Sequence, residues 1–131
     1  MSRGSQGAVR QRAAVIWPFV SVAGLVVSVG GCLLVGRAWR DCDVGVNAVA
    51  DSGALALVFV PLVAVACTWW GAALGVVGRR AGNWVGTLVG VVGSVGIGWA
   101  LMAWLGVPDG YPAPLCAPDN VPAWWPRWLP V

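Results

Sequence analysis

Residues 52–78, SGALALVFVPLVAVACTWWGAALGVVG, form an apolar stretch of 27 residues without a charged side chain. Residues 13–36 and residues 81–108 form two more such stretches, with 24 and 28 uncharged residues. A helix needs about 20 apolar residues to cross the roughly 30 Å hydrocarbon core of a bilayer. Because a helix satisfies its own backbone hydrogen bonds in lipid, the sequence predicts an all-α membrane protein with three transmembrane helices.

The composition also indicates a chain that lies mostly in lipid. Of its 131 residues, 59% are hydrophobic and 10% are charged, whereas about a quarter of the residues in a typical soluble domain are charged. Every basic residue is Arg and every acidic residue is Asp, and the chain contains no His. The net charge of +3 is too small and too scattered for the clustered basic face of a nucleic-acid-binding protein.

The charge-free stretches and their flanking residues set the expected boundaries. We expect a basic tail at residues 1–13, a transmembrane domain at residues 14–107 with helices at 14–36, 53–77 and 83–107, and a tail rich in Pro and Trp at residues 108–131. Pro108 cannot continue the third helix. Asp51 or Ser52 is expected to cap the second helix, and Asn83 the third.

The second helix has two expected features that bear on its neighbours. Residues 78–82 form a very short connection, so the second and third helices should be a tight antiparallel hairpin. Pro61 lies inside the second helix and predicts a kink. Such a kink is either a gate or a bend that packing tolerates.

The arginines predict the orientation in the membrane. Arg3, Arg10, Arg12, Arg79 and Arg80 lie on one side, and only Arg37, Arg40 and Arg127 lie on the other. Because arginine favours the cytoplasmic side, we expect a multi-pass protein of the bacterial cytoplasmic membrane with a cytoplasmic N-terminus and an outer C-terminal tail. All five Asp residues then fall outside. Tryptophans near both helix ends, Trp17 and Trp84 inside and Trp39 and Trp104 outside, suit an aromatic belt.

The first helix has an alternative interpretation as a secretory signal. Residues 29–32, Val-Gly-Gly-Cys, resemble a loose lipoprotein cleavage site. However, the apolar run is longer than the 7–15 residues of a typical signal core, and it continues beyond Cys32. We therefore expect a retained helix.

Small residues recur at every fourth position in the third helix, which indicates a close helix–helix contact. The residues are Gly82, Gly86, Gly90, Ser94 and Gly98. A period of four keeps them on one helix face, where close backbone approach drives association in lipid. The contact is either packing within the three-helix bundle or a seam of a homo-oligomer.

The four cysteines fall into two pairs by location. Cys32 and Cys67 lie within expected helices, and Cys42 and Cys116 lie outside them. Because the outer side of a bacterial membrane is oxidising, we predict a Cys42–Cys116 disulfide. A redox-active pair is disfavoured, because the two lack Cys-x-x-Cys spacing and the acids on both sides of Cys42 disfavour a reactive thiolate.

The C-terminal tail contains seven of the nine prolines, which forbids a helix and favours an extended polyproline-type conformation. Its aromatic and basic side chains form a candidate contact site, which consists of Trp124, Trp125, Arg127 and Trp128. Such residues suit the membrane interface, and they are also favoured anchors in protein interfaces. The tail therefore either lies on the leaflet or the bundle, or docks to a larger partner.

Residues that carry chemistry are scarce. Without His, Lys or Glu the chain offers no nucleophile–base pair and no phosphate-binding lysine. Residues 41–47 have oxygen ligands at alternate positions, but the glycine is one place early and a bidentate Glu is missing. We therefore expect no catalytic residues, no metal site and no cofactor.

In composition and number of spans, and in the segments Asp41-Cys42-Asp43 and residues 122–128 (PAWWPRW), the chain resembles the small multi-pass membrane proteins of high-GC bacteria. That resemblance implies no activity. The sequence is best interpreted as an accessory or scaffold protein, which uses helix packing and its outer tail to contact lipid, another membrane protein or a second copy. The alternative is a subunit of a homo-oligomeric pore or transporter, and an enzyme is disfavoured.

Overall fold

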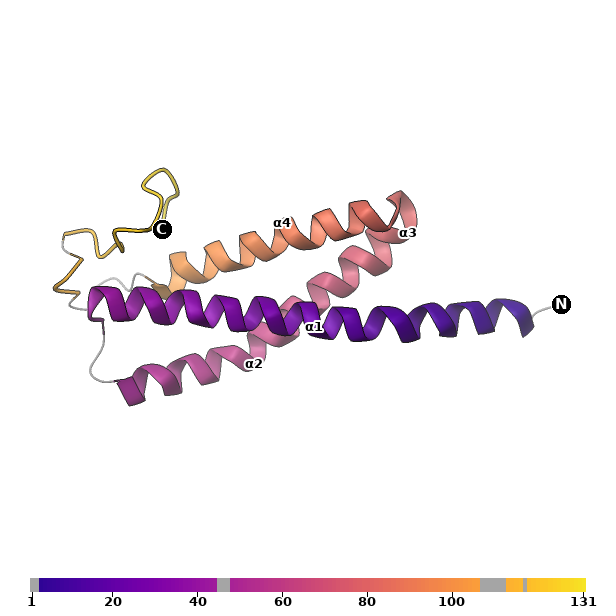
Figure 1. Ribbon diagram of the computed structural model, residues 1–131, viewed down its shortest axis with the longest axis horizontal. Coiled ribbons are helices and arrows are strands. Elements are labelled where there is room, and N and C mark those ends of the chain that lie inside the picture. The colour runs from indigo at the N-terminus through magenta and orange to yellow at the C-terminus, as the bar shows by residue number, and fades with distance from the viewer. Residues whose placement is uncertain (1–2, 45–47, 107–112, 117) are drawn as a thin grey trace.

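The computed structural model describes the chain except for residues 1–2, 45–47, 107–112 and 117. All regular secondary structure among the described residues is helical. The elements are α1 (Arg3–Cys42), α2 (Ala48–Ala72), the π-helix η1 (Ala73–Val77), α3 (Gly78–Ala81), α4 (Asn83–Leu101) and the π-helix η2 (Met102–Gly106). They form three rods, which are α1 alone, α2 with η1 and α3, and α4 with η2 (Figure 1).

Three segments of these rods are long and apolar enough to cross a membrane. They are Val15–Cys42, Val49–Ala81 and Asn83–Gly106. The large apolar side chains that point away from the bundle remain exposed, as with Val22, Leu57 and Val92. A surface of this kind suits lipid as the surrounding solvent.

The first helix is longer at both ends than the expected range of 14–36, because a charge marks the end of an apolar segment and not the end of a helix. Arg is a good helix former, and Arg37 pairs with Asp41 one turn later, Nε to Oδ2 at 3.5 Å. The 40 residues of α1 span about 60 Å, roughly twice a bilayer core. In Figure 1 the N-terminal part of α1 extends beyond the hairpin of the other two rods.

A C-terminal cap ends α1 directly after Cys42. Asp43 adopts a left-handed backbone with a φ of 53°. The N–H of Val44 donates to Trp39 O at 2.8 Å, and the N–H of Asp43 points to Arg40 O at 3.4 Å. This pair of bonds is a Schellman motif, and it fixes the direction in which Cys42 leaves the helix.

The residues expected to cap the second and third helices do not occupy the N-cap positions. The second helix already begins at Ala48, so Asp51 lies in its first turn and Ser52 Oγ donates to Val49 O within the helix. Asp51 is favourably placed there, because a helix N-terminus attracts negative charge. Gly82, and not Asn83, occupies the N-cap position of α4.

The connection between α3 and α4 is the tight antiparallel turn that the sequence predicts. Gly82 has a φ of 100°, a conformation that residues with a side chain rarely adopt. Its N–H donates to Gly78 O at 3.1 Å, and its own carbonyl accepts from Gly86 N–H. In Figure 1 this turn lies at one end of the bundle and the C-terminus at the other.

Two prolines lie inside helices. The second helix continues through Pro61, and in Figure 1 it changes direction about halfway along, as the expected kink requires. Pro18 lies well inside α1, because that helix starts eleven residues earlier than the expected position 14.

The side of α1 that faces the bundle is a single buried stripe with spacings of three and four residues. It consists of Val20, Gly24, Ser28, Gly31, Val35, Ala38 and Cys42. The main apolar core lies toward the Cys42 end, where Val35 and Ala38 meet Leu62, Leu101 and Met102. The tail joins this core, so the bundle and the tail pack as one unit.

Candidate interaction site

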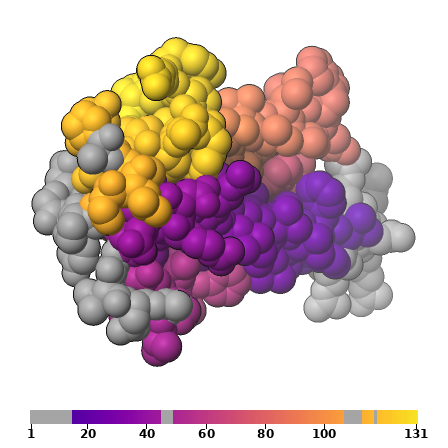
Figure 2. Space-filling view, turned by 60° about the vertical axis from the view of Figure 1, so that its left-hand side comes forward, coloured from indigo at the N-terminus to yellow at the C-terminus, as the bar shows by residue number. Residues whose placement is uncertain are grey.

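The C-terminal tail and the last turns of α1 form the candidate site, which we call the cap (residues 37–44, 113–116 and 118–131). Figure 2 shows the tail, coloured orange to yellow, lying against the end of α1. No helix forms among the described tail residues, as their proline content predicts. The tail is not extended as expected, however, because three hydrogen bonds close turns at Ala113–Cys116, Pro122–Trp125 and Pro126–Leu129.

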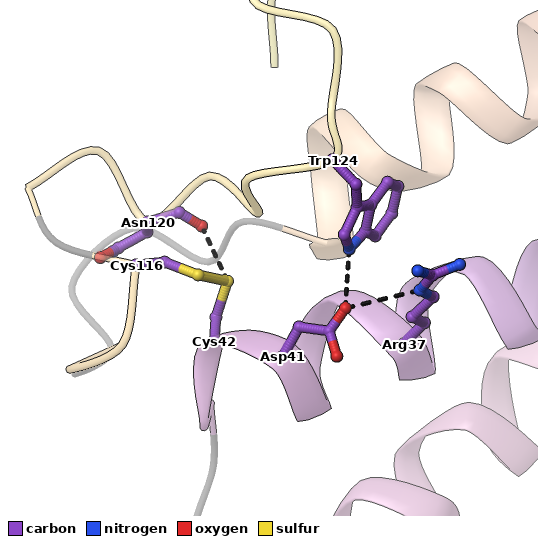
Figure 3. Close-up of a disulfide and its surroundings, with 6 residues drawn as sticks. All are labelled: Arg37, Asp41, Cys42, Cys116, Asn120 and Trp124. Atoms are coloured by element: carbon purple, nitrogen blue, oxygen red, sulfur yellow. Dashed lines mark hydrogen bonds and ion pairs between the residues drawn. A yellow bond between two sulfur atoms is a disulfide. The ribbon is translucent and has the colours of Figure 1, made fainter.

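The predicted disulfide between Cys42 and Cys116 is present, with a Cα–Cα distance of 5.0 Å. It joins residues 74 positions apart, and closing so long a loop typically stabilises a protein by about 2–4 kcal/mol. Cys42 is fully buried and packs with Val44 and Ala113. The carbonyl oxygen of Asn120 also lies 3.7 Å from Cys42 Sγ (Figure 3).

A polar cluster beside the disulfide holds the tail to α1. The indole Nε1–H of Trp124 donates to Asp41 Oδ2 at 2.7 Å, and Arg37 Nε lies 3.5 Å from the same oxygen. Figure 3 shows all three side chains converging. The Arg37 guanidinium is also 5.1 Å from the centre of the Trp124 ring. Because these groups are largely exposed, the ion pair adds little free energy, and its main effect is to orient Trp124.

Trp125 is the point where the tail enters the core. It is buried with Val35, Ala38 and Met102, and it meets Trp124 edge to face with ring centroids 6.0 Å apart. Its backbone N–H donates to Pro122 O at 2.9 Å, which closes the turn Pro122–Trp125. Burial of an indole contributes more free energy than any polar contact of the cap.

A second turn of the same form follows directly. The Leu129 N–H donates to Pro126 O at 3.0 Å, so Pro126–Leu129 repeats the pattern of Pro122–Trp125. Two indoles fix this second turn, since Trp125 donates to Leu129 O at 3.2 Å and Trp99 of α4 donates to Pro130 O at 2.7 Å. The tail is therefore held to α1 by its first part and to α4 by its last part.

The four candidate tail residues divide into two groups. Trp124 and Trp125 make contacts inside the molecule, as described above. Arg127 and Trp128 project outward from the second turn, and Trp128 is 81% exposed. Only Arg127 and Trp128 are therefore fully available to lipid or to a partner.

The small residues predicted for the third helix also fall into two groups, those packed within the hairpin and one with open space beside it. At Gly86 a Cβ atom would lie 2.8 Å from Ala73 O and 3.0 Å from Gly78 Cα, and at Gly90 it would meet the Trp70 ring. The hydroxyl of Ser94 accepts a hydrogen bond from Trp70 Nε1 at 3.1 Å. These three positions thus pack within the hairpin, whereas nothing lies within 4 Å of a Cβ at Gly98.

Sequence reasoning missed a second feature of α4. Its other side borders a groove of about 610 Å³ together with α2, lined largely by small residues: Ala64, Thr68, Ala72, Gly93, Gly96 and Ala100. Trp69 closes one side of it and donates to Gly90 O at 3.2 Å. The signal in the sequence was a small residue at every fourth position of α2 and at spacings of three and four residues in α4.

The π-helix η2 could not be foreseen either. Trp39 of α1 donates its indole N–H to Leu105 O of η2 at 2.6 Å. A π-helical turn changes the backbone pairing of a helix and often marks a functional or strained point. Here it lies directly below the cap, where α1 and α4 meet.

No family model, no curated protein and no solved structure matches the chain.

Proposed function

We propose that this chain is an accessory or scaffold protein of a bacterial cytoplasmic membrane, which binds another membrane protein through its outer surface. In this proposal the three rods span the bilayer with the N-terminus in the cytoplasm and the cap outside. The observation that carries the proposal is the cap itself. A disulfide and three indole hydrogen bonds hold a short tail in one conformation, and a preordered segment binds a partner at lower entropic cost.

The interior of the bundle supports a function at the surface. Ser28 is the one buried polar side chain among the described residues, and its hydroxyl donates to Gly24 O at 2.7 Å. The core around Val35, Leu62 and Met102 is apolar. A path for ions or protons ordinarily has ionisable groups or water-lined polar surface inside the spans, so a single copy offers no supported route.

The orientation rests on the arginines. Arg79 and Arg80 lie exposed in the hairpin turn, and the N-terminal part of α1, which carries Arg3, Arg10 and Arg12, extends past the same end of the bundle (Figure 1). The cap carries the other three arginines, Arg37, Arg40 and Arg127. The side with the larger number of arginines is thus the side of the hairpin turn. This agrees with a cytoplasmic turn under the positive-inside rule.

The test is purification of the tagged full-length chain from native membranes after crosslinking, with identification of what it captures. Asp119→Asn neutralises an exposed charge of the cap, and Arg80→Gln neutralises an exposed charge on the opposite side as the matched control. The proposal requires a membrane protein that is lost with Asp119→Asn and retained with Arg80→Gln. Capture that does not differ between the two variants would contradict it.

A second candidate function is a subunit of a homo-oligomeric pore or transporter. The groove between α2 and α4 favours it, because small residues on both helices permit close approach of another helix. Gly96→Leu would fill the groove, since a Cβ there meets nothing within 4 Å. This candidate requires crosslinked oligomers and ion flux in liposomes, both reduced by Gly96→Leu; monomers without flux would exclude it.

A further inference from the structure

The ten tryptophans form two groups, according to whether the indole N–H donates to an oxygen of the protein. Six indoles donate to protein oxygens: Trp39, Trp69, Trp70, Trp99, Trp124 and Trp125. None of these six is more than 41% exposed. The other four, Trp17, Trp84, Trp104 and Trp128, donate to none of the residues that the structure describes, and they are 68–81% exposed.

The four free indoles lie toward opposite ends of the bundle. Trp17 and Trp84 lie toward the end of the hairpin turn, and Trp104 and Trp128 lie at the cap end. Trp84 and Trp104 are twenty residues apart on the α4–η2 rod, which corresponds to about 30 Å along a helix. That distance matches the thickness of a hydrocarbon core. An exposed indole with a free N–H is favoured at the headgroup level, where one part of the ring is in an apolar region and the N–H finds an acceptor.

The tail brings the turn that carries Trp128 back alongside α4. The bond from Trp99 to Pro130 O holds the end of the chain beside α4, because Trp99 precedes the end of η2 by seven residues, or about 10 Å. Figure 1 likewise places the C-terminus beside the outer end of α4 and not beyond it. Trp128 therefore projects from a turn that lies alongside a membrane-spanning rod.

We propose that the turn Pro126–Leu129 is an interfacial anchor, inserted among the phospholipid headgroups of the leaflet on the disulfide side. Trp128 enters the boundary between headgroups and acyl chains, and Arg127, exposed in the same turn, meets the lipid phosphates. The preceding turn Pro122–Trp125 has Trp124 at the equivalent position. Asp41 binds that indole instead, so the two turns have the same form and different surroundings.

The experiment uses the full-length chain with 5-fluorotryptophan, placed in nanodiscs of phosphatidylcholine and phosphatidylglycerol and observed by fluorine NMR. Trp→Phe substitution, one position at a time, assigns the resonances of Trp84, Trp104, Trp124 and Trp128. A lipid with a nitroxide near its headgroup and a gadolinium chelate in the water are then added in separate samples.

The anchor predicts that Trp128 loses its resonance with the nitroxide lipid, as Trp84 and Trp104 do, while Trp124 keeps most of its intensity. Retention of Trp128 with the nitroxide lipid and its loss with the chelate would overturn the anchor. Retention with both reagents, which a protein covering Trp128 would cause, would overturn it as well. If Trp84 and Trp104 are also unaffected by the lipid, the spans themselves are wrong, and the anchor fails with them.

Discussion

Trp39 of α1 donates its indole N–H to the carbonyl oxygen of Leu105, which belongs to the π-helical end of the last rod, at 2.6 Å. This bond joins the first and last spans just below the cap. It lies next to the core formed by Val35, Ala38 and Met102. The first and last rods are thus connected through a backbone carbonyl and not only through apolar contacts.

Replacement of Trp39 by Phe should lower the free energy of unfolding by about 1 kcal/mol, because the Leu105 carbonyl loses its indole donor. Trp104→Phe is the matched control in the same region, since Trp104 is exposed and its indole has no acceptor among the described residues. Denaturant unfolding in mild detergent measures both. Equal losses in the two variants would show that the bond to Leu105 does not contribute.

Replacement of Cys42 and Cys116 by Ser should lower the free energy of unfolding by about 2–4 kcal/mol, because the unfolded chain regains the entropy of a long loop. The control is Cys32→Ser, which changes a free cysteine of α1. Maleimide labelling of the denatured wild-type chain should modify two cysteines without reductant and all four after reduction. Four labelled cysteines without reductant would disprove the disulfide.

Gly86→Ala should be strongly destabilising, and Gly98→Ala should not. The added methyl at position 86 would lie 2.8 Å from Ala73 O and 3.0 Å from Gly78 Cα, and such overpacking typically costs about 1–3 kcal/mol. At position 98 the methyl meets nothing within 4 Å, and Ala has the higher helix propensity. Thermal unfolding in detergent compares them; similar midpoints would refute the close contact at Gly86.

Reporter fusions should show that the hairpin turn and the C-terminal tail lie on opposite sides of the membrane. Alkaline phosphatase, which is active only outside the cytoplasm, should be active when fused after Val131 and inactive when fused after Ala81. The physical reason is the number of arginines near the hairpin turn. The reverse pattern of activity would invert the proposed orientation.

The sequence predicted the three spans, the hairpin and the disulfide, because each depends on a local property of the chain. Apolar length predicts the spans, the five-residue connection predicts the hairpin, and the location of Cys42 and Cys116 outside the apolar runs predicts their pairing. The helix boundaries were less accurate. The first helix continues from Gly36 to Cys42, since its charged last turns remain helical and the Schellman motif alone ends it.

The tail shows what could not be predicted from the sequence. Proline excluded a helix correctly, but the folding of the tail into turns depends on distant acceptors and donors, such as Asp41 for Trp124 and Trp99 for Pro130. The repeated pattern of Pro122–Trp125 and Pro126–Leu129 was visible in the sequence. Nothing in that pattern distinguishes a buried Trp125 from an exposed Trp128, because the surrounding helices decide which ring is covered.

The disulfide also constrains how often the chain crosses the bilayer. Cys42 and Cys116 can be joined only if both are on the same side, so the segment between them must cross an even number of times. The two rods of the hairpin are long and apolar enough to give two crossings. If α1 spans the bilayer as well, the total is odd, and the two termini would lie on opposite sides of the membrane. The disulfide thus requires an even number of crossings between Cys42 and Cys116, whatever the distribution of arginines. In a membrane it could form only after both rods of the hairpin have been inserted.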